Sequence, residues 1–245
     1  MKNSNLYSNL AIVCTKFYDL AVDEKKVAEF VESKIGKFEP KKILFVGGFF
    51  LVAKELLGKG YDLTVVDYTD EMVAEGKKRL PNTRIIKADV RDLPFKGEFD
   101  AVLVIGRVFT HMYSNDDANK ALQSIRKSLK PNGILLFDNY EDSKITKTNY
   151  FNGKICLKEK GVEITRDSTT ELISTEPFIV NWKATYTLKE NGKSRRFKDG
   201  IEHRAFSRKE IKELVEHNGL KQIENGNNFD ETSFYSIARK APQSD

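Results

Sequence analysis

The sequence predicts an α/β fold in which a parallel sheet carries crossover helices. Between residues 42 and 138, short apolar runs alternate with stretches of helical periodicity, and this alternation is typical of strands joined by helices that cover a parallel sheet. Between residues 150 and 206 the period changes to two, which indicates an antiparallel insertion. The 245 residues are 40% hydrophobic and 31% charged, a composition typical of a globular protein.

The first two thirds of the chain supply one leading helix and five strands. Residues 24–35 place Val27, Phe30, Val31 and Ile35 at helical spacing, and Pro40 then ends the pattern. Five strand runs follow in order, KILFVG, DLTVVD, TRIIKAD, FDAVLVIG and ILLFD. The intervening LVAKELLGKG, DEMVAEGKKRL and residues 116–129 have helical patterns, and a turn is expected at residues 131–133.

After residue 146 the sequence pattern predicts the insertion and then a return to the α/β pattern. Apolar residues at 182, 184, 186 and 188 alternate along one strand before the turn at residues 190–192. Ser207 is the expected N-cap of a helix in which Glu210 completes a capping box, and Gly219 follows its end. Strands at residues 221–224 and 234–238 close the fold. We therefore expect one domain over residues 1–245, with residues 146–206 as an inserted β-rich cap.

Charge and composition exclude several classes of protein. The net charge of +5 comes from 41 basic and 36 acidic residues mixed along the chain, so a nucleic-acid partner is not expected. The apolar runs are far shorter than the roughly 20 residues that span a bilayer, so no membrane association is expected. Cys14 and Cys156 form no disulfide framework, which favours a cytoplasmic location and inert packing roles. His203 and His217 lack metal-spaced partners, so we expect no metal.

Three strand ends carry the residues that suggest a ligand. Gly47 and Gly48 stand between the first strand and its helix, Asp67 ends the second strand about 20 residues on, and Asp89 follows the third. Glycines beside a helix N-terminus let backbone N–H groups approach a ligand, and a carboxylate at a strand tip can accept from two ribose hydroxyls. Helix-packing glycines and a solvated carboxylate are the alternative interpretation.

With this spacing the chain resembles the class I S-adenosylmethionine-dependent methyltransferases from about residue 17 to residue 240. The resemblance implies a Rossmann-like three-layer sandwich with a seven-stranded, mostly parallel sheet that contains one antiparallel strand. It also implies S-adenosylmethionine as the cofactor, with Asp89 and Val90 beside the adenine. The cofactor-binding residues that it implies are Tyr18, Gly47, Gly48, Phe49, Asp67, Tyr68, Asp89, Val90 and Gly106.

The glycine loop departs from the pattern of that family. The chain reads Phe45-Val46-Gly47-Gly48-Phe49-Phe50, so Phe45 replaces an acidic residue and two rings follow the glycines. The rings of Phe49 and Phe50 either line the methionine end of the site, where aromatic faces attract a sulfonium cation, or block it. We expect an open pocket, because Asp67 and Asp89 are both retained.

Within the family the chain is most similar to small-molecule N-methyltransferases, including the amino-sugar type. The resemblance rests on Tyr18-Asp19, on the segment RVFTHM that contains His111, and on the insertion after the fifth strand. It implies a small-molecule acceptor methylated at an amine nitrogen. His111 is the candidate catalytic residue, either as an acid/base group or as a loop residue bound to backbone, since methyl transfer needs no general base when positioning is good.

Two other functions stay open at this stage. The basic run KSRRFK at residues 193–198 would serve an RNA or protein methyltransferase. The altered glycine loop would instead suit a non-catalytic binding protein with a methyltransferase-like fold. The sequence leaves the acceptor and the oligomeric state open, and it is compatible with a homodimer.

Overall fold

The computed structural model describes residues 6–145, 151–159 and 161–240. Its main sheet has seven strands in the order β10-β11-β5-β4-β1-β2-β3, in which β11 runs antiparallel to both of its neighbours and the other pairs are parallel. The predicted mixed sheet is therefore confirmed. The strands are β1 (Lys42–Val46), β2 (Asp62–Asp67), β3 (Arg84–Lys87), β4 (Phe99–Val104), β5 (Leu129–Tyr140), β10 (Leu220–Asn227) and β11 (Ser233–Lys240).

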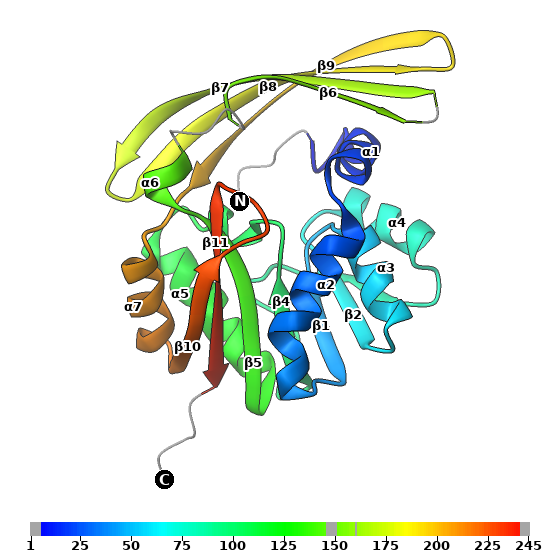
Figure 1. The fold of residues 1–245 in the computed structure, drawn as a ribbon. Helices are drawn as coiled ribbons and strands as arrows, with labels where there is room; N and C mark the ends of the chain where they lie inside the picture. Colours follow the sequence, from blue (N-terminus) through cyan, green and yellow to red (C-terminus); the bar gives the residue numbers. More distant parts are fainter. Residues whose placement is uncertain (1–5, 146–150, 160, 241–245) are drawn as a thin grey trace.

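Helices cover both faces of this sheet and make a three-layer sandwich (Figure 1). On β1, Ile43 and Phe45 pack into one hydrophobic core, while Leu44 and Val46 pack into the other, as strand geometry requires. The first core is covered by α2 (Glu24–Ile35), α3 (Phe50–Gly58) and α4 (Asp70–Arg79), and the second by α5 (Asn115–Ser128) and α7 (Arg208–His217). Short helices lie at η1 (Gly36–Phe38), η2 (Val108–His111) and α6 (Asp142–Ile145).

The insertion forms a second, four-stranded antiparallel sheet that lies over the main domain (Figure 1). Its strands are β6 (Gly153–Glu159), β7 (Val162–Thr175), β8 (Phe178–Glu190) and β9 (Lys193–Arg204). Trp182 and Tyr186 of β8 face inward and share a third core with Phe17 of the N-terminal helix α1 (Ala11–Ala21). We call this sheet the cap. Of the expected insertion, residues 146–150 and 160 lie outside the described residues.

Four local features differ from expectation. Helix α1 was not predicted. The expected turn at residues 131–133 is a bulge inside β5, where Asn132 has a φ of +64°. Ser207 does cap α7, but the Glu210 carboxylate binds the buried Arg204 at 2.6 Å. Both cysteines were expected to be packing residues. Cys14 is buried, but Cys156 is exposed.

The fold also bears on membrane association. In the described ranges, no helix is both long enough and apolar enough to cross a bilayer.

Replacing Ser207 with alanine should lower the free energy of unfolding by about 1 kcal/mol. The Ser207 hydroxyl accepts a hydrogen bond from the backbone N–H of Glu210 at 3.0 Å, and this satisfies one donor at the start of α7. Urea unfolding measures the change. Lys209→Ala on the same helix is the control, because the Lys209 side chain is 86% exposed. Equal effects of the two substitutions would contradict the capping role.

Candidate functional site

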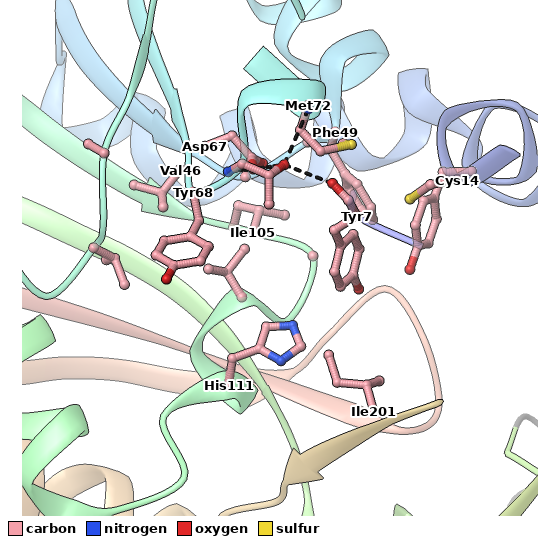
Figure 2. Close-up of a pocket in the computed structure, with 18 residues that line it drawn as sticks. Tyr7, Cys14, Val46, Phe49, Asp67, Tyr68, Met72, Ile105, His111 and Ile201 are labelled. Atoms are coloured by element: carbon pink, nitrogen blue, oxygen red, sulfur yellow. Dashed lines mark hydrogen bonds between the residues drawn. The ribbon is translucent and has the colours of Figure 1, made fainter. Parts of the chain in front are cut away.

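A pocket opens at the carboxyl ends of β1, β2 and β4 (Figure 2). Ligands of open α/β sheets bind in the crevice outside these strand ends. Figure 2 shows Asp67 and Met72 toward one end of the pocket and His111 and Ile201 toward the other. Of the site residues predicted from the sequence, those that line the pocket are Tyr18, Gly47, Gly48, Phe49, Asp67, Tyr68, Val90, Gly106 and His111.

The turn between β1 and α3 requires glycine at position 47, and a second glycine follows it at position 48. Gly47 has a φ of +110°, and a Cβ added there would lie 2.7 Å from the Cγ2 atom of Val108. A Cβ on Gly48 would lie 2.2 Å from the Cε atom of Met72 and 3.7 Å from a carboxylate oxygen of Asp67. The turn therefore brings bare backbone close to the carboxylate at the tip of β2.

The two phenylalanines of the glycine loop lie in different places. Phe49 lines the pocket, where its ring packs over Gly106 and lies 5.3 Å from the Tyr18 ring centroid. Phe50 is buried against α4, and a Cβ on Gly76 would approach its ring to 2.7 Å. Phe45, which stands where the resembled family has an acid, is fully buried in the core. The pocket beside Asp67 therefore stays open, with one ring at its wall.

Asp67 supplies the carboxylate of the pocket. Its oxygen accepts a hydrogen bond from the backbone N–H of Thr69 at 3.1 Å. Burial raises the pKa of Asp67 to about 6, although the backbone hydrogen bonds from Thr69 and Tyr68 oppose that rise. A ligand that donates hydrogen bonds to this carboxylate would favour its ionised form.

Asp89 lies outside the pocket lining, although its neighbours Ala88 and Val90 are part of it. The Asp89 carboxylate binds the guanidinium of Arg91, with Oδ2 2.6 Å from Nη2, and Arg91 also binds Asp117 at 2.6 Å. Burial acts to raise the pKa of Asp89, but the hydrogen bonds from Arg91 outweigh it and lower the pKa. A role for this carboxylate toward a ligand remains a prediction.

His111 stands where the first pocket meets a second one. Burial lowers the pKa of His111 to about 4, so the ring is neutral at physiological pH. Its Nδ1 atom has no hydrogen-bond partner among the described residues. The second pocket lies between the main sheet and the cap and shares Tyr7, Tyr18, Gly106, His111 and Ile201 with the first. The lining that only the second pocket has includes Arg107, Tyr140, Phe151, Arg166, Trp182, Tyr186, Asp199 and His203.

Several residues that line the pockets could not be predicted from the sequence. Tyr7 comes from the segment before α1, and its carbonyl accepts a hydrogen bond from the Thr69 hydroxyl at 2.8 Å. Ile201 comes from the cap. Both lie far from the glycine loop along the chain, so only the folded arrangement brings them to the pocket. Across the described ranges, no three His, Cys, Asp or Glu side chains gather into a metal site.

A model of the methyltransferase domain family matches residues 47–133. The glycine/sarcosine N-methyltransferase of Halorhodospira halochloris is 34% identical over 94 residues, which are 35% of this chain and 35% of that protein. The chain spans between 33% and 40% of the length of the first three curated relatives that it matches.

Solved structures match nearly the whole chain. A methyltransferase from Clostridium acetobutylicum superimposes with a TM-score of 0.78 at 17% identity, covering 96% of this chain and 98% of its own. The amino pentose methyltransferase CalS10 from Micromonospora echinaspora, solved with bound S-adenosylmethionine, superimposes with a TM-score of 0.74 at 17% identity. The match covers 90% of this chain and 92% of CalS10. The fold is that of the S-adenosylmethionine-dependent methyltransferases. The resemblance seen in the sequence is thus confirmed, and it supports S-adenosylmethionine as the cofactor of this methyltransferase fold.

Replacing Phe49 with leucine should narrow the preference for S-adenosylmethionine over its neutral product, S-adenosylhomocysteine. An aromatic face attracts a sulfonium by about 0.5–2 kcal/mol, while a thioether lacks that attraction. Calorimetric titration of both ligands gives the affinity ratio. Phe50→Leu is the matched control, because Phe50 packs on α4 and should change stability while leaving the ratio unchanged. A changed ratio in the control alone would refute the assignment.

Proposed function

We propose that the protein transfers a methyl group from S-adenosylmethionine to the amine nitrogen of a small-molecule acceptor. The observation that carries the proposal is the turn at Gly47 and Gly48, which holds bare backbone beside the Asp67 carboxylate in a pocket at the strand ends. When bound, S-adenosylmethionine supplies a methyl group activated by the positive charge of its sulfur.

The residues of the first pocket fit this cofactor. Asp67 would accept hydrogen bonds from the two ribose hydroxyls, and the glycine turn would present bare backbone to the nucleoside beside that carboxylate. Tyr18 and Phe49 present rings at the pocket wall, which suits a sulfonium. The fit supports the enzyme over a binding protein that has lost the cofactor.

Val90 and Asp89 are the residues proposed to bind the adenine of the cofactor. Val90 lines the pocket and its backbone N–H would donate to the ring. Asp89 would accept from the exocyclic amine only if a carboxylate oxygen serves both the ligand and Arg91, or if Arg91 turns toward Asp117 alone. The backbone of Val90 is therefore the firmer part of this proposal.

The acceptor would occupy the second pocket. That pocket joins the first at Tyr7, Gly106 and His111, so an acceptor there would meet the methyl group at the shared wall. The names of similar proteins, an amino pentose methyltransferase and a glycine/sarcosine N-methyltransferase, support an amine acceptor of small size. The buried, neutral His111 suits an uncharged amine, and positioning with desolvation would supply much of the rate.

Methyl transfer itself can be tested with purified protein. Calorimetry should detect binding of S-adenosylhomocysteine, and mass spectrometry should detect methylated product when S-adenosylmethionine is mixed with glycine, sarcosine or an amino pentose. Cofactor binding without any methylated amine would refute the amine acceptor. Absence of binding would refute the enzyme.

The affinity for S-adenosylhomocysteine should fall about tenfold as the pH is lowered from 7 to 5. Asp67, with a pKa of about 6, is ionised at the upper pH and protonated at the lower, and protonation removes an acceptor for the ribose hydroxyls. Calorimetry at several pH values measures the effect. Asp67→Asn should bind at least tenfold more weakly at pH 7, because charge-assisted hydrogen bonds are lost, and should show a flat profile. A wild-type profile without this slope would contradict the assignment.

A further inference from the structure

His203 lies in the second pocket on strand β9 of the cap, opposite the loop that carries His111. It is 7% exposed, and its ring centroid lies 5.4 Å from that of His111 and 6.1 Å from that of Trp182. The two histidines approach from different sheets, because His111 follows β4 of the main sheet. Both line the second pocket, where the proposed acceptor would sit.

The hydrogen bonds of Thr110 fix the proton on the His203 ring. The Thr110 hydroxyl is fully buried and donates its single proton to the carbonyl of Arg107 at 2.7 Å. Its oxygen also lies 3.3 Å from Nδ1 of His203, and because a hydroxyl has one proton to give, Nδ1 must be the donor there. Burial first, and then the nearby His111 and Arg107, lower the pKa of His203 well below its usual value. The ring is therefore neutral, and Nε2 carries a lone pair.

We propose that His203 binds the acceptor amine, with Nε2 accepting a hydrogen bond from its N–H and so turning the nitrogen lone pair toward the methyl group. This inference rests on the proposed function. In a neutral amine the N–H groups and the lone pair point in different directions, so holding an N–H fixes where the lone pair points. As the nitrogen gains its fourth bond it becomes positive, and the hydrogen bond to Nε2 strengthens. An interaction that strengthens in the transition state raises kcat.

His203 suits this role better than His111. The Nδ1 atom of His111 has no partner among the described residues, so no hydrogen bond at that atom selects one tautomer. The His203 ring is held through Thr110 to the loop after β4, and its own strand is paired with β8, where His203 lies opposite Val180. The Nε2 atom of His203 is thus pre-organised to accept a hydrogen bond, which lowers the entropic cost of orienting the amine.

The proton position on His203 is measurable by nitrogen NMR on the full chain with ¹⁵N-labelled histidine and bound S-adenosylhomocysteine. We expect a neutral His203 at pH 7 with its proton on Nδ1, and a shift of the Nε2 signal on saturation with methylamine. Thr110→Val should produce a mixture of tautomers. A proton on Nε2 in the wild-type protein, or an Nε2 signal unmoved by methylamine, overturns the proposal.

Two substitutions at His203 distinguish a role in positioning the amine from a purely structural role of the ring. An asparagine amide can still donate to Thr110 but has no atom near Nε2, whereas a glutamine amide can place its oxygen there. We expect His203→Asn to lower kcat for amine methylation by about 10–100-fold and His203→Gln to recover much of the loss. Both should bind S-adenosylhomocysteine like the wild type, because His203 does not line the first pocket.

The outcomes distinguish this inference from the proposed function. Equal kcat in the wild type and His203→Asn overturns the role of His203 while methyl transfer stands. If the wild type binds S-adenosylhomocysteine but methylates none of methylamine, glycine or an amino pentose, the amine acceptor fails, and the NMR result alone decides whether Nε2 receives an N–H.

Discussion

A buried carboxylate at the end of β5 fixes the loop on which both pockets depend. Asp138 is fully buried and accepts hydrogen bonds from the backbone N–H groups of Gly106 at 3.3 Å and Arg107 at 2.7 Å. Both residues have positive φ angles, +89° and +65°, and Arg107 adopts its left-handed conformation without being glycine. The Arg107 guanidinium in turn reaches Asp230 between β10 and β11 at 2.5 Å. Hydrogen bonds to the buried carboxyl group of Asp138 thus offset a strained turn.

That one loop links the glycine turn to the cap. Val108 packs where Gly47 has no side chain, so a shift of the loop would press on the backbone of the first pocket. Three residues further on, His111 forms a wall of both pockets, and between them Thr110 holds His203 of the cap. The first and second pockets are therefore set relative to each other by a single short segment. A packed interior transmits displacements of this kind because it has few voids.

The sheet and much of the lining of the first pocket were predictable from the sequence, but the lining of the second pocket was not. Gly47, Gly48 and Asp67 stand at strand ends, and parallel strands bring such ends to one edge, so chain order alone places them together. Tyr7 and His203 reach the site from segments whose position depends on how α1 and the cap pack, and no local pattern encodes that. The sequence also contains Arg91 two residues after Asp89, but nothing in the spacing shows that the guanidinium binds that carboxylate.

The distribution of charge around the two pockets suits the proposed amine acceptor, which would then react without a general base. In the first pocket the carboxylate of Asp67 offers acceptors, whereas the lining of the second pocket contains two arginines, Arg107 and Arg166, and one carboxylate, Asp199. Burial keeps His111 and His203 neutral there. Surroundings that disfavour a protonated imidazole also disfavour a protonated amine. An amine entering this pocket would therefore shed its proton to solvent beforehand and arrive with its lone pair available.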